Sequence, residues 1–193
     1  AYAISVRLVG SELCIRDRVS DSRGAWFRAT ILFILALIGT VGMWSVVVFI
    51  PDIEKEFGLD RGTSSLLYAF TMIGFGFGTV VIGKVYDKFG IKKPILLATF
   101  VLITSYYFYS IFPFYWQFLI LQFFMGFAAS AFFGPAMADI SNFFNKQRGF
   151  ALSIVASANY VAGATWPLLI GYFLTFIDWR DAHFWISICL FIM

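Results

Sequence analysis

Long apolar runs separated by short polar breaks follow one another from residue 29 to the end of the chain. Five of them are near or above the ~20 residues that an α-helix needs to cross the hydrocarbon core of a bilayer. They cover residues 29–50, 63–85, 94–112, 116–140 and 150–176. Because lipid offers the backbone no hydrogen-bond partners, runs of this length are expected to be helices. Pro51 and Pro113 are expected to end the first and third runs.

The two ends of the chain differ from this pattern. The last apolar run, 184–193, would rise only ~15 Å as a helix, about half the hydrocarbon thickness. Since the sequence stops inside this run and does not begin with Met, we expect a fragment that holds the start of a sixth membrane helix. Residues 1–20 lack any sustained apolar run, and the stretch SVRLVGSELCIRDR resembles translated adaptor sequence found at the ends of environmental gene fragments. We therefore interpret 1–20 as a non-native or disordered tail and 21–193 as the folded unit.

Composition supports a membrane protein. The chain is 61% hydrophobic and 13% charged, whereas a soluble domain is nearer half apolar and a quarter charged. No basic stripe or Lys/Arg-rich arm is present in the sequence, so nucleic acid is not an expected partner. His183 is the only histidine, which excludes a multi-histidine metal site, and neither a metal nor a cofactor is expected.

Basic residues gather on one side of the predicted bundle. The positive-inside rule places loops rich in Lys and Arg in the cytoplasm, and the basic residues on this side are Arg23, Arg28, Lys84, Lys88, Lys92, Lys93, Lys146 and Arg148. The other side carries most of the acidic residues, namely Asp52, Glu54, Glu56, Asp60, Asp178 and Asp181. We therefore expect a multi-pass protein of the cell's inner (plasma) membrane with a cytoplasmic N-terminus.

A glycine- and lysine-rich segment follows the second run. Gly83 and Gly90 permit a tight turn, and Asp87 is an anion that needs a cation or a helix end as partner. The segment resembles the loop signature of the major facilitator superfamily, although Ile91 stands where many members have a basic residue. The resemblance implies a gating loop that holds the cytoplasmic side closed, with the candidate residues Gly83, Asp87, Lys88, Gly90, Lys92, Lys93 and Arg148. Arg148 enters as the hypothetical ion-pair partner of Asp87.

A second resemblance concerns the start and end of the fifth run. The segment NFFNKQRGFA at residues 142–151, followed by Asp178-Trp179-Arg180, is similar to the monocarboxylate and oxalate/formate-like branch of the same superfamily. The segment at Glu56-Phe57-Gly58 is similar to that branch too. Two departures weaken any inference of proton coupling or antiport from this resemblance. Gln122 replaces an arginine of many proton-coupled members, and Trp166-Pro167 replaces the Gly-Pro of the antiporter pattern.

The substrate cavity is expected near the middle of the bilayer. No charge lies deep in the five runs, so the candidates are neutral side chains: Trp44, Tyr68, Gln122, Ser130, Asn159, Tyr160 and Trp166. Amides in lipid demand partners, so Gln122 and Asn159 are expected to face the bundle interior or a wet cavity, and hydrogen bonding between helices is the alternative to contact with solute.

These observations predict an all-α membrane protein with a major-facilitator-type bundle, five full transmembrane helices plus a truncated sixth. The resemblance implies the N-terminal six-helix half of a secondary transporter, such as a symporter, that works by alternating access. Its expected partners are a small solute such as a monocarboxylate or related organic anion, a coupling proton or other ion, the lipid bilayer and a C-terminal half. The alternative is a non-transporting polytopic scaffold or assembly protein, and an enzyme is not expected.

Overall fold

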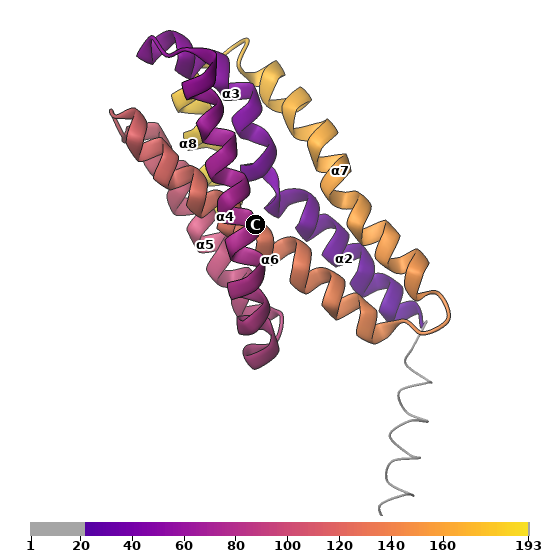
Figure 1. Cartoon of the computed structure of the whole chain (residues 1–193). Helices are drawn as coiled ribbons and strands as arrows, with labels where there is room; N and C mark the ends of the chain where they lie inside the picture. The colour runs from indigo at the N-terminus through magenta and orange to yellow at the C-terminus, as the bar shows by residue number, and fades with distance from the viewer. Residues whose placement is uncertain (1–21, 193) are drawn as a thin grey trace, which may run out of the picture.

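The computed structural model describes residues 22–192, and all the regular elements of this part of the chain are helices (Figure 1). Residues 1–20, the predicted tail, lie outside the described residues. In chain order the helices are α2 Arg23–Gly39, α3 Val41–Phe57, α4 Arg61–Phe89, α5 Lys92–Ile111, α6 Tyr115–Phe143, α7 Arg148–Phe173 and α8 Trp179–Ile192.

Five stretches are long and apolar enough to cross a membrane. The first is the continuous pair α2–α3, which together cover 35 residues, and the others are α4, α5, α6 and α7. α8 has 14 residues, which rise about 21 Å, less than the ~30 Å of the hydrocarbon core. The predicted all-α membrane bundle of five spanning helices and a shorter sixth is confirmed.

The prediction that Pro51 ends the first span is wrong. α3 continues through Pro51 to Phe57, and Gly58 ends it with a left-handed φ of 62°. A proline removes one N–H and so one hydrogen bond, here to the carbonyl of Val47, but the other helical bonds remain. The prediction for Pro113 is confirmed, because α5 ends at Ile111.

The two ends of the bundle differ in charge. We call the end where α4 passes into α5 and α7 begins the basic end, because it carries Lys84, Lys88, Lys92, Lys93, Lys146 and Arg148. We call the opposite end, where α3 passes into α4 and α7 into α8, the acidic end. There Asp60 caps α4: its carboxylate accepts hydrogen bonds from the hydroxyl and amide of Thr63 and the amide of Gly62, which lower the pKa of Asp60.

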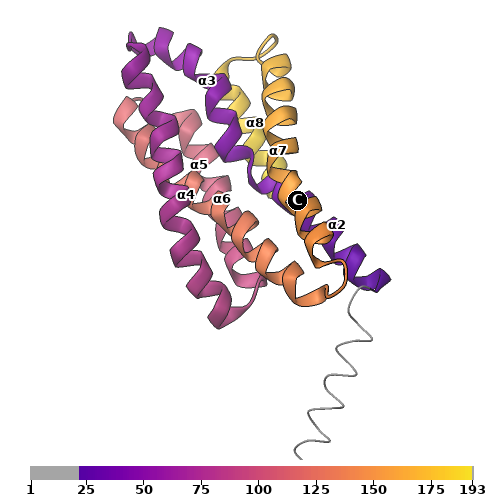
Figure 2. The ribbon, with the colours of Figure 1, turned by 45° about the vertical axis from the view of Figure 1, so that its right-hand side comes forward.

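Glycines bring α4 and α6 into contact. A Cβ atom added to Gly74 would overlap the carbonyl of Phe123 in α6, and one added to Gly126 would overlap the carbonyl of Thr71 in α4. Small residues at such crossings let membrane helices pack at short distance. The two helices lie side by side in both views (Figures 1 and 2).

His183 lies inside the acidic half of the core and not at an aqueous surface. Its ring is 1% exposed and stacks on Tyr109 with centroids 4.4 Å apart, while Phe49 lies 4.0 Å away on another side. Its Nδ1 is 2.7 Å from the carbonyl oxygen of Trp179, one turn earlier in α8. These contacts fix α8 against α3 and α5.

Gly126→Ala is expected to destabilise the protein by about 1–3 kcal/mol, the usual cost of an overpacked core. The new methyl group has no room beside the Thr71 carbonyl, and backbone cannot move aside as a side chain can. The matched control is Gly134→Ala, also in α6, because nothing lies within 4 Å of the position of its Cβ. Thermal melting in detergent measures the stability of both variants. Equal melting temperatures for the two variants would contradict the packing assigned to Gly126.

Candidate functional site

Part of the predicted gating loop forms a tight turn between α4 and α5 at the basic end. Gly90 has a φ of 72°, and its amide donates to the carbonyl of Tyr86 at 2.7 Å, which closes the last turn of α4. Glycine is the residue that adopts this left-handed conformation at least cost. The ammonium groups of Lys88 and Lys93 lie over the Phe89 ring, 5.3 and 4.2 Å from its centroid.

The remaining gating-loop candidates lie on the surface. Asp87 and Lys92 are exposed, and Gly83 lies in α4 with nothing within 4 Å of the position of its Cβ. Arg148 is the first residue of α7 and is also exposed. The ion pairs found among the described residues do not join Asp87 to Arg148, so the hypothetical pair is not formed in this conformation.

A different ion pair stands at the basic end. Nε and Nη2 of Arg28 donate to the two carboxylate oxygens of Asp139, at 2.5 and 2.8 Å. The Asp139 side chain is 8% exposed and the Arg28 side chain 41%, and the guanidinium group also lies 4.4 Å from the centroid of the Phe143 ring. Beside the pair, Tyr86 of α4 hydrogen-bonds with Asn142. This cluster therefore joins α2, α4 and α6 at one point.

The acidic end has an ion pair of its own. Nη2 of Arg180 donates to the Glu56 carboxylate at 2.6 Å, and the Trp179 indole N–H donates to the same carboxylate at 2.8 Å. Nη1 of Arg180 donates to the carbonyl of Phe112 at 2.9 Å. These bonds hold the first turn of α8 against the ends of α3 and α5. They also join two segments that the sequence singled out separately, at Glu56 and at Trp179-Arg180.

Three of the predicted cavity residues meet between the first span and α7. The Trp44 indole N–H donates to the Asn159 side-chain oxygen at 3.0 Å, and the Trp166 indole N–H donates to the carbonyl of Leu37 at 2.8 Å. A Cβ added to Gly163 would lie about 3.0 Å from the Trp44 ring. Trp44, Asn159 and Trp166 are each half-buried, at the depth where the first span is interrupted.

Gln122 and Ser130 lie apart from this group, in the interface between α4 and α6. Gln122 is 1% exposed; its side-chain oxygen accepts from Thr71 at 3.0 Å and its amide donates to the Tyr109 hydroxyl at 3.3 Å. Ser130 is fully buried and donates to the carbonyl of Phe127. Gln122 therefore makes the bonds between helices that the sequence left open as the alternative to solute contact, and Asn159 makes one with Trp44.

Tyr68 and Tyr160 join neither group. Tyr68 is half-buried against the apolar core, on the acidic half of α4. Tyr160 is 73% exposed on α7. The structure thus divides the predicted cavity residues into a cluster at the first span, two buried polar side chains and two separate tyrosines.

Sequence reasoning missed the pairing of Arg28 with Asp139, because 111 residues separate them along the chain. One signal was available. Asp139 is the only carboxylate among the buried residues of the described chain, and a charge at the end of an apolar run needs a partner.

Helices long enough to cross a membrane, tied together by ion pairs at both ends, define a multi-pass α-helical membrane protein. The family model described as "Major Facilitator Superfamily" matches residues 32–193, and the chain belongs to this family.

Three fungal proteins are among the curated relatives that match part of this sequence. "MFS transporter asaE" of Aspergillus flavus is 31% identical over 54% of this chain and 23% of its own length. "Agnestins efflux protein AgnL12" of Paecilomyces divaricatus is 28% identical over 63% of this chain and 29% of its own length. "MFS-type transporter eupM" of Phoma sp is 25% identical over 75% of this chain and 52% of its own length. The chain spans about a quarter to a half of these three relatives.

Arg28→Gln is expected to lower the free energy of unfolding by about 1–3 kcal/mol, below the 3–5 kcal/mol of a fully buried pair because Arg28 is partly exposed. The loss arises because Asp139 stays buried without its cation. Adding Asp139→Asn removes that charge and should restore most of the melting temperature. Arg61→Gln is the control: its pair with Glu54 is exposed, so about 0–1 kcal/mol is expected. A double variant as unstable as the sum of the two single variants would contradict the pair.

Proposed function

We propose that this chain forms the N-terminal half of a secondary transporter that moves a small organic solute across the plasma membrane by alternating access. Membership of the major facilitator superfamily points to a transporter rather than an enzyme. The observation that carries the proposal is the family match over residues 32–193, together with a face of the bundle that is open within residues 22–192. The two units α2–α5 and α6–α8 are interpreted as three-helix repeats of inverted topology.

The open face belongs to α4 and α7. Only 28% and 22% of the residues in their apolar stretches are buried, against 61% in α6. Both helices carry glycines with open space beside the Cβ position, at Gly76 and Gly83 in α4 and at Gly149 and Gly171 in α7. Glycines on exposed faces of membrane helices let further helices approach closely. We assign this face to contact with a C-terminal half.

The basic end is assigned to the cytoplasm, which places the N-terminus on that side, because lysines and arginines favour it. Asp87 lies there on the exposed face of the last turn of α4. Its carboxylate is positioned to bind a helix N-terminus or a cation of the second half when the cytoplasmic side is closed. Lys88 and Lys93, held on the Phe89 ring, add positive charge around that contact.

The proposed solute is an organic anion such as a monocarboxylate, and a proton or another ion is its proposed coupling partner. Trp44, Asn159 and Trp166 would offer it aromatic surface and one amide, without charge. The charge of the solute would then be met by residues of the second half. The relatives' names favour export, since one of them is called an efflux protein for agnestins.

Transport by the protein from its complete gene, reconstituted in liposomes, tests this function. We expect labelled monocarboxylates to cross faster than through protein-free liposomes, with a dependence on a proton gradient. Movement of other organic solutes only would overturn the assignment to organic anions. A folded protein that moves no small solute in either direction would overturn the transporter and favour the scaffold or assembly role.

Asp87→Asn is expected to slow transport about tenfold to a hundredfold. A hydrogen bond to a charged group contributes about 1.5–3 kcal/mol, and each 1.4 kcal/mol is a factor of ten. The control is Asp52→Asn, which also neutralises one carboxylate but at the acidic end. Because Asp87 is exposed, the melting temperature should not change. Equal transport by the two variants would contradict the gating role of Asp87.

A further inference from the structure

We propose that the first membrane span and α7 bend together at two facing weak points, Gly39–Thr40 and Gly163–Pro167, which we call the paired hinge. Two tryptophan hydrogen bonds cross between these points, so that bending of one helix requires bending of the other. The inference concerns motion within this chain and holds for any solute.

The first weak point interrupts the first span in mid-membrane. α2 ends at Gly39 and α3 begins at Val41, and Thr40 between them has φ −89° and ψ 5°. The Thr40 hydroxyl and amide both donate to the carbonyl of Ala36, at 2.8 and 3.1 Å. A Cβ on Gly39 would overlap the Phe132 ring of α6, so only glycine fits there. The break is therefore built into the packing, and the hydroxyl and amide of Thr40 both bond to the preceding turn.

The second weak point lies opposite, in α7. Pro167 lies inside the helix and has no N–H to donate, so the helical bond to the carbonyl of Gly163 is absent. Glycine and proline in one turn are common causes of kinks in helices. The Gly163 position lies against the Trp44 ring of α3. Each helix thus has a missing or altered hydrogen bond where it faces the other.

The two tryptophan bonds cross the hinge in opposite senses. Trp166, inside the weak turn of α7, donates to Leu37, which lies before the break in the first span. Trp44, which lies after that break, donates to Asn159, which lies before the weak turn of α7. A bend at either point changes the distances of both bonds. Since unpaired N–H groups are costly in a membrane, the two bends are coupled.

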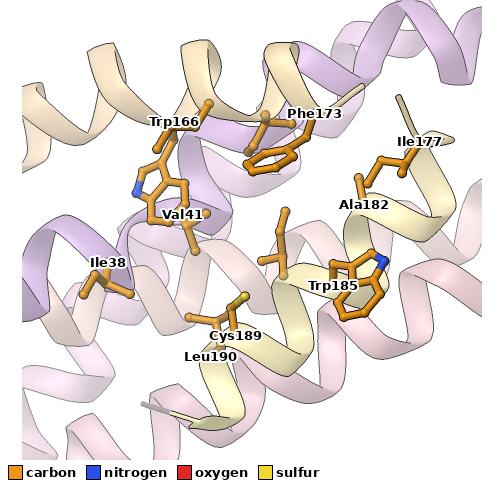
Figure 3. A pocket seen from close by; sticks show the side chains of 12 residues that line it. Ile38, Val41, Trp166, Phe173, Ile177, Ala182, Trp185, Cys189 and Leu190 are labelled. Atoms are coloured by element: carbon orange, nitrogen blue, oxygen red, sulfur yellow. The ribbon is translucent and has the colours of Figure 1, made fainter. Parts of the chain in front are cut away.

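An apolar cavity of about 600 Å³ gives the hinge room to move. Ile38 and Val41, on either side of the break, line it together with Trp166 of α7 and Trp185 of α8 (Figure 3). Packed interiors resist motion because they hold few voids. Here the space lies directly beside the turn that has to bend, and Trp166 borders it.

The test measures the bend of each helix separately, by distances between spin labels in the full protein in lipid nanodiscs without solute. Labels attached through genetically encoded ketone residues at the exposed positions Phe27 and Lys55 report on the first span. Labels at the exposed positions Phe150 and Tyr172 report on α7. Because no transport is measured, failure of the proposed function cannot imitate failure of the hinge.

Pro167→Ala restores the missing N–H and should straighten α7. The paired hinge predicts that it also narrows the distance distribution in the first span and shifts its mean by about 1.5 Å or more, one residue's rise along a helix. A change confined to α7 would overturn the coupling.

Trp166→Phe removes one crossing bond and should broaden both distributions, and Asn159→Ala, which removes the other, should do the same. Trp185→Phe is the control, because its indole lines the same cavity but makes no hydrogen bond within residues 22–192. Broadening in one helix alone, or equal broadening by Trp185→Phe, would overturn the proposal.

Discussion

Lipid supplies no hydrogen bonds and no counter-charges, and this single constraint accounts for the hydrogen bonds and ion pairs that these helices make with one another. Both oxygens of the buried Asp139 carboxylate accept hydrogen bonds from one guanidinium group, that of Arg28. The break at Thr40 is capped by its own hydroxyl, and the neighbouring Leu37 carbonyl takes an indole N–H from α7. In a soluble protein, water could satisfy such polar groups. Here they bond to one another and so join helices that are distant in sequence.

The ties at the two ends follow one scheme. The first span ends in Glu56 and α6 ends near Asp139, and each carboxylate receives an arginine from a helix on the other side of the α5–α6 connection. Arg180 of α8 forms an ion pair with Glu56, and Arg28 of α2 forms one with Asp139. Because each bond crosses between α2–α5 and α6–α8, the two three-helix units are held together at both membrane faces. This arrangement leaves the middle of the bundle as the place where helices can change shape.

The sequence predicts the helices well because hydrophobic length in a membrane leaves few alternatives. It fails at Pro51, where a missing N–H does not stop a helix that lipid and neighbouring helices favour. It does not reveal the interruption at Thr40, because Gly39 is needed only for its contact with Phe132, which is 93 positions further along the chain. For the same reason, the grouping of Trp44 with Asn159 and the burial of Gln122 become visible only once the helices are packed.

Ion pairs fix both ends of the bundle, whereas the helices near its middle are less regular, and this difference bears on how the protein can move. Ion pairs hold both ends, whereas the first span is interrupted at Thr40 and α7 lacks one helical hydrogen bond at Pro167. We therefore expect motion to concentrate where Trp44, Asn159 and Trp166 lie. In carriers that bind solute near the bilayer midplane, a flexible site can adapt to the solute without loosening the contacts at the membrane faces. The neutral character of these three residues fits such a role, because uncharged hydrogen bonds can exchange partners at lower cost than a buried ion pair. On the paired-hinge proposal, the charge pairs keep the helices in register while the two tryptophan hydrogen bonds change together.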